Sequence, residues 1–521
     1  MQDIMRNMHR LFVSIVALCA LNIATAQPKL AINIVVSSMK ATDIERYSIN
    51  FSQEGFMRLY NGGASFTECY TDFVPTSSQM CLATIATGAQ PSMHGIASTQ
   101  WHDRTAGNAI IHLCQDSKGN YTTDHFTAPT LAQTLATSER AGRVVTIAHN
   151  ASSAMILAGK QNECYWIDSI GNWSTANCYA KSIPDWLNAQ NEISFNRSYV
   201  RNTWFGKLSK SRYINTRATD IAIYDIYSKP KNSDKKPIPN WVNTLMTTPA
   251  ANNAIFTLAK KIVDQMVADK RNDDYCDMLT ICLDAPREIA QKYGPDSIEY
   301  EDMLYCLDAN IAELMAHIDA IFPRQSDYLI TLTSDRGIGQ INPKDFNTQQ
   351  AEVILNAFLS AQYGQGKWVL SCNNGSIYLN RDQIYSKKLS IAQVQNEAAT
   401  FVMQFRGIAN TATATALQGG IMSSSTARLM QNAFYPRRCG DILYCLQPDY
   451  YQIDEQYVAQ SGSPYNHDRH IPLIFYGAGI ESGKIERKVS SSAIAVSTAA
   501  MLGITRPNCA DGDMIYELKH R

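Results

Sequence analysis

The stretch VPTSSQMCLATIATG, which runs from Val74 to Gly88, decides how the rest of the chain is interpreted. It predicts the end of an apolar strand, a tight Pro-Thr-Ser-Ser turn and a short helix. Ser78 is expected at the helix start, where free backbone N–H groups and the helix dipole favour an anion. In a hydrolase, a hydroxyl nucleophile would meet a phosphate or sulfate group at such a position.

Strands and helices alternate on both sides of this stretch. Apolar runs predict strands at Leu30–Val36, Arg143–His149, Asp277–Leu283, Tyr328–Thr333 and His470–Gly477. Helices are predicted to end at Asn61-Gly62-Gly63, to span Thr130–Gly142 and Asn252–Ala268, and to begin at a capping box of Asp296 and Glu299. Continuous apolar strands are typical of a parallel sheet with both faces covered. The sequence therefore predicts an α/β fold with a mostly parallel central sheet.

Two stretches interrupt this alternation. Residues 151–250 are irregular and rich in Asn, Ser, Trp and Tyr, and their segment Lys229–Trp241, rich in Lys, Pro and Asn, predicts an exposed loop. Residues 342–457 are again mixed. We expect both stretches to be cap insertions that cover the crevice at the strand ends of one α/β domain, residues 27–521.

The N-terminus has the pattern of a signal peptide. Arg6 and Arg10 precede an apolar run, Leu11–Ile23, and Ala24-Thr25-Ala26 forms a cleavage site. We expect residues 1–26 to be removed and the mature protein to be periplasmic or secreted. The apolar run is short for a membrane span and no later stretch suits one, so no transmembrane segment is expected. The formal net charge of -1 gives no reason to expect nucleic acid as a partner.

The cysteines suggest disulfides in an exported chain. Of thirteen cysteines, Cys19 lies in the expected signal peptide, which leaves an even number. Candidate groups are Cys164 with Cys178, Cys439 with Cys445, and the cluster of Cys276, Cys282 and Cys306. The sequence does not determine the pairing, and buried thiols are the alternative.

Ligands of open parallel sheets bind at the carboxyl ends of the strands. The polar residues expected to meet there are Ser37, Ser78, Asp284, Arg287, Asp335, Arg336, Ser461, His467, Asp468 and His470. The chain resembles the alkaline phosphatase superfamily at these points. It is most similar to phosphate-irrepressible alkaline phosphatases and to type I phosphodiesterase/nucleotide pyrophosphatase proteins of Bacteroidetes.

Four segments carry the resemblance, in order along the chain. They are VPTSSQMCLATIATGAQPSMHGIASTQW for the nucleophile, DMLTICL with GPDSIEYEDMLYCLD for the central metal strand, TLTSDRG for the family's S-A-D-H-G, and GSPYNHDRHIPLIFYGAGI for the last metal segment. The resemblance implies a three-layer α/β sandwich. It also implies hydrolysis of phosphate esters by a Ser or Thr nucleophile and two zinc ions.

The resemblance also shows which functional positions have changed. The first-strand Asp falls on Ser37, the Asp and His of D-x-x-x-H on Arg287 and Gln291, the Asp-His pair on Asp335 and Arg336, and the last His on Ser461. Outside the metal set, the phosphoryl-binding Asn falls on Thr99, and the Lys and Arg typical of monoesterases fall on Asn150 and Ser152. A shift of three residues would offer Asp284 and Glu288 as ligands, but it spoils the match of strand and helix.

Only Asp335 remains at a metal-ligand position, with Ser78 at the nucleophile position. One carboxylate cannot hold two zinc ions, and Arg287 and Arg336 repel cations. The sequence therefore predicts a pseudoenzyme without a cofactor. It would bind an anionic, phosphate-like ligand through Ser78, Thr99, Arg287 and Arg336, or a protein partner.

Simpler interpretations stand beside this one. Ser78 would then be only a helix cap, and Asp335 would form a salt-bridge plug with the two arginines. The alternative function is a divergent phosphomonoesterase or phosphodiesterase that uses Ser78 and zinc. Its metal ligands would come from Asp284, Glu288, Asp335, His467 and Asp468. His94 and His470 are expected to be structural, and Cys81 is expected to be a buried thiol.

Overall fold

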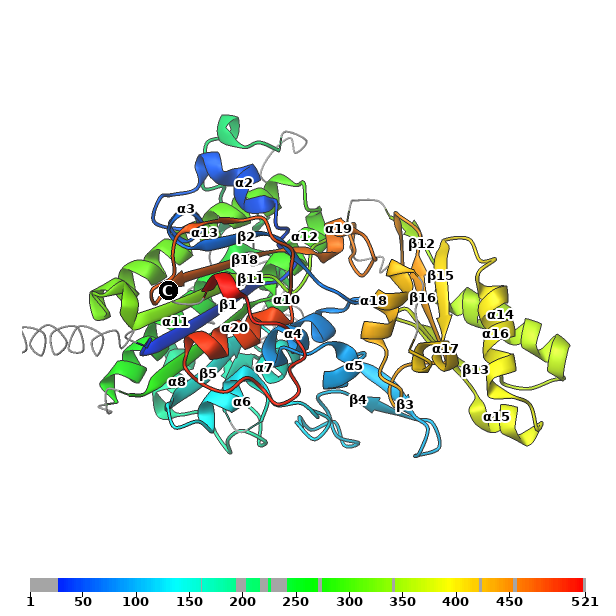
Figure 1. Ribbon diagram of the computed structural model, residues 1–521. Coiled ribbons are helices and arrows are strands. Elements are labelled where there is room, and N and C mark those ends of the chain that lie inside the picture. Colours follow the sequence, from blue (N-terminus) through cyan, green and yellow to red (C-terminus); the bar gives the residue numbers. More distant parts are fainter. Residues whose placement is uncertain are drawn as a thin grey trace, which may run out of the picture.

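The computed structural model describes residues 27–160, 162–193, 203–215, 224–225, 241–269, 274–339, 343–420, 424–452 and 457–518. Residues 1–26 and residues 229–240 of the predicted loop lie outside these ranges. Figure 1 shows a larger body built around a central sheet and a smaller body beside it, coloured mostly yellow. None of the helices in the described ranges is long and apolar enough to cross a membrane.

The central sheet has ten strands in the order β19-β2-β18-β11-β1-β10-β5-β6-β7, with β20 beside β2. The bounds are β1 Leu30–Val36, β2 Ala64–Tyr70, β5 Ala141–Ala148, β6 Glu163–Ile167, β7 Trp173–Ser174, β10 Cys276–Leu283, β11 Tyr328–Thr333, β18 His470–Gly477, β19 Gly483–Ile485 and β20 Val489–Ser490. Strands β11, β1, β10, β5 and β6 run parallel. Strand β18 is antiparallel to both of its neighbours. The sheet is therefore mixed but mostly parallel, as predicted.

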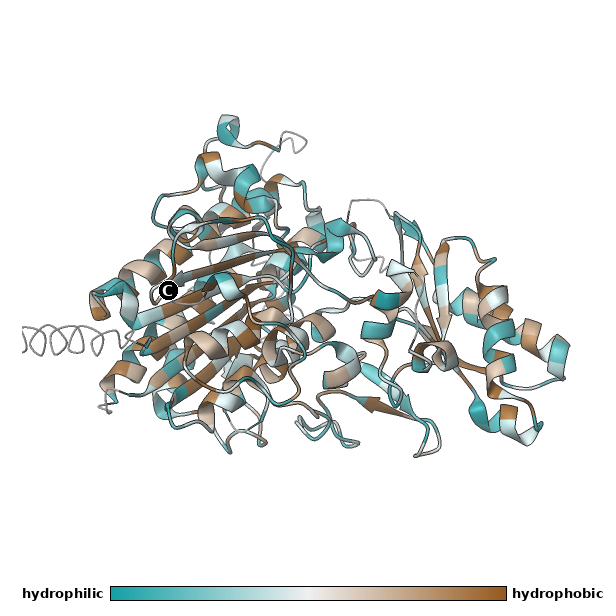
Figure 2. Ribbon diagram, viewed as in Figure 1, coloured by the Kyte–Doolittle hydropathy of each residue, from teal (hydrophilic) through white to brown (hydrophobic). Residues whose placement is uncertain are grey.

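The alternation of side chains along β1 builds two cores. Ile32 and Ile34 belong to the core under α11 (Pro249–Ala268), α12 (Ala285–Tyr293) and α13 (Ile298–Ile321). Ala31 and Val35 belong to the core under α4 (Ser78–Thr87), α6 (Leu131–Ala136), α7 (Ala151–Ala158) and α20 (Ala493–Met501). Figure 2 shows the apolar strands between helices whose outer faces are more polar. The predicted three-layer sandwich is confirmed.

Two predicted helix boundaries are wrong. The helix predicted over Thr130–Gly142 ends at Ala136, and Gly142 belongs to β5. A Cβ atom at Gly142 would lie 2.4 Å from the Asp277 carboxylate and 2.5 Å from the Cys276 carbonyl oxygen, so the glycine permits close approach of β10. The long helix α13 is capped by Ser297, whose hydroxyl accepts a hydrogen bond from the Tyr300 N–H at 3.1 Å, and not by Asp296.

The first predicted insertion starts later than expected. Residues 151–167 form α7 and β6, which extend the central sheet. Further along, Trp204 donates a hydrogen bond to Asp302 at 2.7 Å, and the Asn215 N–H donates to Glu301 at 2.8 Å. Both acceptors lie on α13. This part of the insertion therefore packs against a helix of the sandwich and does not cover the strand ends.

The second predicted insertion forms the smaller body, and we call residues 343–452 the cap. Its four-stranded sheet has the order β13-β14-β16-β15. The strand bounds are β13 Val369–Asn373, β14 Ser376–Leu379, β15 Ile408–Thr413 and β16 Ile442–Leu446, and the packed helices are α14 Thr348–Tyr363, α15 Arg381–Ser386, α16 Ile391–Val402, α17 Ala414–Gln418 and α18 Ser425–Ala433. The cap has its own apolar core around Trp368 and Leu359.

Arginine contacts attach the cap to the larger body. Arg438 donates hydrogen bonds to the carbonyl oxygens of Gly95 at 2.9 Å and His125 at 2.7 Å. The buried carboxylate of Asp441 pairs with Arg381 at 2.8 Å and with Arg104 at 3.4 Å. Because Arg438 and Asp441 are buried in the cap and bond to groups of the larger body, these contacts hold the cap over the strand ends.

The disulfide prediction is wrong for the described residues, in which all twelve cysteines are free. Most of them are buried in the apolar cores, where burial raises the pKa of the thiol, as for Cys439, whose pKa rises to about 11. Its sulfur accepts a hydrogen bond from the Tyr435 N–H at 3.2 Å. Cys81 is a buried thiol within α4, as expected. Packing in the cores therefore accounts for the buried cysteines, whereas Cys178 is exposed and Cys306 and Cys509 are partly exposed.

Two buried histidines predict acid sensitivity. His94 and His149 are 1% and 2% exposed, and burial lowers the pKa of each to about 3. Below pH 6.5 the unfolded chain binds protons at these residues, whereas the folded chain does not until about pH 3. The free energy of unfolding is therefore expected to fall as the pH decreases through this window, by about 1.4 kcal/mol per pH unit for each histidine.

Urea unfolding at pH 7.0 and pH 5.0 measures this dependence. In a His94→Gln variant the loss between the two pH values should be smaller than in the parent by about 2 kcal/mol. The exposed His112 provides the control variant, His112→Gln, which should behave like the parent. Equal pH dependence of the parent and His94→Gln would contradict the prediction.

Candidate functional site

The carboxyl ends of the parallel strands face the cap, and a pocket of about 410 Å³ lies between them. It is lined from the larger body by residues 75–80, Thr99, Arg287, Gln291, Arg336 and residues 460–463, and from the cap by Asn374, Gly375, residues 444–446 and residues 450–452. The structure thus brings Ser78, Thr99, Arg287 and Arg336 to one place. No residue of the first insertion that the structure describes lines this pocket.

The start of α4 presents Ser78 without using it as a cap. The N-cap is Ser77, whose hydroxyl accepts a hydrogen bond from the Met80 N–H at 3.3 Å. Ser78 is the first helical residue. Gly88 ends the helix with a left-handed backbone at φ 70°. The interpretation of Ser78 as only a helix cap is therefore wrong, and its hydroxyl is available for other contacts.

That hydroxyl is held by Asp335, which is fully buried. Ser78 Oγ donates to Asp335 Oδ2 at 2.5 Å. The other carboxylate oxygen accepts the backbone N–H groups of Ser38 at 2.9 Å and Arg336 at 2.8 Å. Asp335 therefore ties three segments together: the end of β1, the start of α4 and its own strand end.

Arg287 completes a cluster of charges around Ser78. Its guanidinium donates to Ser78 Oγ at 3.2 Å and pairs with Asp284 at 3.4 Å and Glu288 at 3.0 Å. Burial alone would lower the pKa of Arg287, but Asp284, Glu288 and Asp335 outweigh it and the pKa is raised. The pKa of Asp284 is raised by its burial, against the opposing effect of Arg287. The direct salt bridge between Arg287 and Asp335 that the predicted plug requires is therefore not formed: Arg287 pairs with Asp284 and Glu288 and reaches Asp335 only through Ser78 Oγ.

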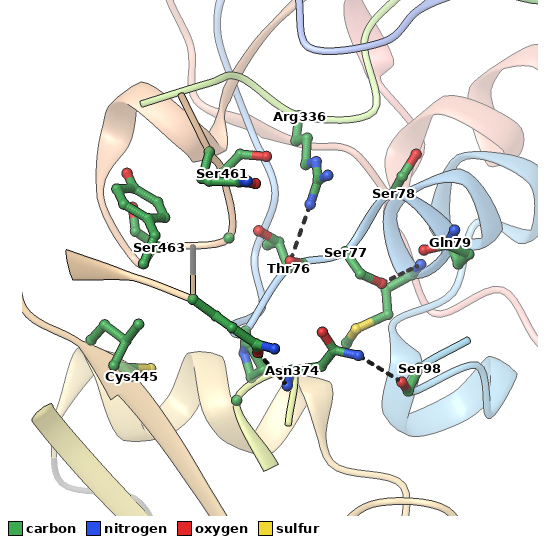
Figure 3. A pocket seen from close by; sticks show the side chains of 18 of the residues that line it. Thr76, Ser77, Ser78, Gln79, Ser98, Arg336, Asn374, Cys445, Ser461 and Ser463 are labelled. Atoms are coloured by element: carbon green, nitrogen blue, oxygen red, sulfur yellow. Dashed lines mark hydrogen bonds between the residues drawn. The ribbon is translucent and has the colours of Figure 1, made fainter. Parts of the chain in front are cut away.

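Arg336 does not belong to that plug. Only its backbone contacts the Asp335 carboxylate, whereas its guanidinium donates to the Thr76 carbonyl oxygen at 3.3 Å. Its Nε atom is buried and has no hydrogen-bond partner. Figure 3 shows Arg336 reaching toward Thr76, with Ser461 and Ser463 on one side and Ser78 and Gln79 on the other. Arg336 is therefore positioned to bind a group inside the pocket.

The remaining candidates organise the surroundings of the pocket. Asp468, whose pKa is raised by burial, accepts the N–H groups of Gly462 at 2.9 Å and Ser463 at 2.7 Å. His467 lies 2.9 Å from the Tyr451 hydroxyl. His470 is structural, because its Nε2 lies 2.6 Å from the Thr67 carbonyl oxygen and its ring stacks on Tyr70.

His94 is structural as well, with its two ring nitrogens bonded to the Ile96 N–H at 3.0 Å and to Thr84 at 3.2 Å. At the two positions where monoesterases have Lys and Arg, the side chains bond to each other, since Ser152 donates to Asn150 at 3.0 Å. Asn150 also caps α7 by accepting the Ser153 N–H. These residues support local structure.

The residues present do not fit a two-zinc centre. The resemblance assigns five of the six ligand positions to Arg287, Gln291, Arg336, Ser37 and Ser461, none of which carries a carboxylate or imidazole, and Gln291 donates to Gln460 at 3.1 Å. The Arg287 guanidinium already occupies the space beside Ser78 and Asp284 that a cation would need. Within the described ranges, no group of three or more His, Cys, Asp or Glu residues is placed to hold a metal ion.

Sequence reasoning missed several residues of this region. Ser153 donates to Asp284 at 2.8 Å, and the Asp284 N–H donates to His149 Nδ1 at 2.9 Å. Both partners follow the end of β5. They could have been predicted, because polar residues at the carboxyl ends of parallel strands meet at one edge of the sheet. Thr76 and the cap residues Asn374 and Gln452 also line the pocket, and no sequence pattern points to the cap residues.

Comparison with known proteins agrees with this fold. A family model described as type I phosphodiesterase/nucleotide pyrophosphatase matches residues 31–470. The chain is 24% identical over 524 residues to alkaline phosphatase PafA of Elizabethkingia meningoseptica, covering 95% of each chain. It is 25% identical over 524 residues to a protein of Myroides odoratus named calcium-transporting ATPase, covering 94% of each.

The crystal structure of wild-type PafA superposes with a TM-score of 0.83 at 23% identity, covering 95% of this chain and 99% of that one. This match shows the same fold, and the resemblance to the alkaline phosphatase superfamily is confirmed. Because the family model spans most of the sequence, the chain belongs to the type I phosphodiesterase/nucleotide pyrophosphatase family.

Proposed function

We propose that this protein is an exported, non-hydrolytic member of its family that binds an anionic, phosphate-like group in the pocket under the cap. The observation that carries the proposal is the position of Arg287. Its guanidinium bonds to Ser78 Oγ and pairs with Asp284, where the family places a metal ion against the nucleophile. Export is inferred from the signal-peptide pattern of residues 1–26.

The surroundings of Ser78 argue against nucleophilic attack. A serine hydroxyl is a weak nucleophile unless an adjacent base or a metal ion activates it. Here Arg287 takes the place of a metal ion, and the Asp335 carboxylate, the adjacent candidate base, is engaged by backbone groups. In the described structure, the hydroxyl donates to Asp335, and that carboxylate also accepts two backbone N–H groups. Arg287 holds the hydroxyl as well, because its guanidinium donates a hydrogen bond to Ser78 Oγ. These contacts fix Ser78 as part of the framework of the site.

The pocket nevertheless has the chemistry of an anion site. Among the described residues, its lining contains two arginines and no carboxylate, since Asp284, Asp335 and Asp468 are fully buried. Glu288 lines the neighbouring pocket, where it pairs with Arg287. Arg336 Nε, Thr76 Oγ1 and Ser461 Oγ are buried atoms that have no hydrogen-bond partner among the residues the structure describes. The N-terminus of the ten-residue helix α4 faces the same space. Phosphate or sulfate would satisfy these groups by charge-assisted hydrogen bonds.

Isothermal titration with inorganic phosphate at low ionic strength tests the proposal. Phosphate should bind the parent, and Arg336→Gln and Arg287→Ala should each weaken binding about tenfold or more, because each removes a hydrogen bond to a charged group. The exposed Arg324 does not line the pocket, so Arg324→Gln is the matched control. Absence of phosphate and sulfate binding, or unchanged affinity in Arg336→Gln with the fold intact, would refute it.

A divergent phosphoesterase is the second candidate, and one observation favours it. Ser78 Oγ is oriented between a carboxylate and a guanidinium at 2.5 and 3.2 Å, as a positioned hydroxyl would be. Purified protein that contains about two zinc ions per chain and hydrolyses p-nitrophenyl phosphate, with the activity abolished by Ser78→Ala, would establish this function in place of the first.

A further inference from the structure

Outside the anion site, the pocket is lined by many side chains that could form hydrogen bonds with the hydroxyl groups of a ligand. Five amide side chains line it: Gln79, Gln291, Asn374, Gln452 and Gln460. Hydroxyl side chains lie among them, namely those of Thr76, Ser77, Ser98, Thr99, Ser461 and Ser463. A side-chain amide both donates and accepts hydrogen bonds, and so does a ligand hydroxyl. A ligand with several hydroxyls would therefore find partners in this lining.

The amides come from both bodies and are held near one another. Asn374 of the cap donates from its side chain to Ser98 of the larger body at 3.5 Å. Its backbone N–H donates to Gln452 Oε1 at 3.4 Å. Figure 3 shows Asn374 and Ser98 together below Thr76, on the side of the pocket opposite Arg336. A ligand whose anionic group is bound by Arg336 would extend toward these amides.

Three of the four tyrosines that line the described part of the pocket do not offer a stacking surface for a nucleobase, and the fourth, the partly exposed Tyr457, donates to Glu288 at 2.9 Å. Tyr444 is 2% exposed and packs on Phe346 with ring centroids 5.4 Å apart. The Lys344 ammonium lies over the ring of Tyr450, 5.4 Å from the ring centroid. Tyr451 is buried. Base recognition usually requires an open aromatic face. The described lining thus has many more amide and hydroxyl side chains than open aromatic faces, which favours a hydroxylated ligand over a planar one.

The space around Arg287 continues beyond this pocket. A second, more open pocket of about 530 Å³ shares Gln79, Thr99 and Arg287 with the first. It adds further polar side chains, including Asn150, Ser152 and Gln115, together with the Glu288 carboxylate that pairs with Arg287 and the exposed ring of Tyr121. A ligand of more than one ring would therefore pass from one pocket to the other along polar groups.

We propose that the anionic group is carried by a sugar, so that the ligand is an acidic saccharide. The phosphate, sulfate or carboxylate would be bound by Arg336 and Arg287, and the sugar hydroxyls by Asn374, Gln452 and Gln79. This inference rests on the proposed function. The proposed function says that an anionic group binds in the pocket, and the inference identifies the rest of that ligand as a sugar.

Titration calorimetry with five probes tests it: inorganic phosphate, glucose, glucose 6-phosphate, glucose 6-sulfate and AMP. Glucose 6-phosphate or glucose 6-sulfate should bind at least about tenfold more tightly than inorganic phosphate, which corresponds to one or two added hydrogen bonds. AMP should not exceed inorganic phosphate by that factor. A double variant, Asn374→Ala with Gln452→Ala, should remove the advantage of the sugar esters. Asn396→Ala, at an exposed position on α16, is the matched control.

The outcomes separate the two proposals. Binding of phosphate with no gain from either sugar ester, or a larger gain from AMP, refutes the saccharide and leaves the anion site standing. A gain that persists in the folded double variant also refutes the assignment of these amides. No binding of any anionic probe refutes the proposed function itself.

Discussion

Replacing Asp335 with alanine is expected to lower the free energy of unfolding by about 3–5 kcal/mol. The carboxylate is fully buried and accepts hydrogen bonds from Ser78 Oγ and from the N–H groups of Ser38 and Arg336. Its removal leaves buried donors without acceptors, each at a cost of about 1–3 kcal/mol. It also removes negative charge that compensates Arg287. Equilibrium urea unfolding at pH 7 measures the loss.

Asp335→Asn separates charge from hydrogen bonding. Its amide oxygen can still accept the two backbone N–H groups, and its NH₂ can donate to Ser78. The asparagine variant should therefore lose less stability than the alanine variant. Asp264→Ala is the control, because this exposed carboxylate pairs only at the surface with His317 and should change stability by less than about 1 kcal/mol. A loss in Asp335→Ala no larger than that of the control would show that this carboxylate does not hold the strand ends together.

The strands of the sandwich could be predicted because their signal is local. β1, β10, β11 and β18 are continuous apolar runs that end in polar residues, and this pattern is enough to place them within a residue or two. Gly142 shows the limit. In the sequence it resembles the end of a helix. In the structure it lets β10 approach β5 closely, and the contacting residues of β10 lie more than 130 residues further along the chain.

Part of the site could also be predicted, because the strand ends that carry it can be located from the local sequence. Ser78, Arg287 and Arg336 each follow a predicted strand or turn, and parallel strands bring such positions to one edge. The separation of the two arginines could not be predicted: Arg287 pairs with Asp284 and Glu288, whereas Arg336 points into the pocket. The roles of Asn374 and Gln452 depend on how the cap docks, which long-range contacts such as those of Arg438 determine.

The disulfide prediction failed for a different physical reason. Counting cysteines treats them as cross-links, but a free cysteine also behaves as a small apolar residue. Cys282 lies on the fully buried strand β10, and Cys69 on β2 is fully buried. Nothing in the local sequence distinguishes such a residue from a half-cystine. Only the three-dimensional packing of the two cores distinguishes a free buried cysteine from a disulfide-bonded one.

Restoring the missing ligands should convert the pocket into a metal centre. A variant with Ser37→Asp, Arg287→Asp, Gln291→His, Arg336→His and Ser461→His would present six Asp and His side chains together with Asp335. We expect it to bind about two zinc ions per chain, whereas the parent should bind essentially none. It should also hydrolyse p-nitrophenyl phosphate, and adding Ser78→Ala should abolish this activity. Metal analysis after dialysis and a colorimetric assay measure both effects.

The matched control keeps Arg287 and makes the other four substitutions. Its guanidinium would remain beside Ser78 Oγ, repel a cation and hold Asp284, so this variant should bind less zinc and show no activity above the parent. Circular dichroism and a thermal melt establish that each variant is folded. Full zinc loading of the parent would show that the arginines do not exclude metal. A folded five-substitution variant that stays free of zinc would show that the geometry of the strand ends, and not only their side chains, has diverged from a two-metal site.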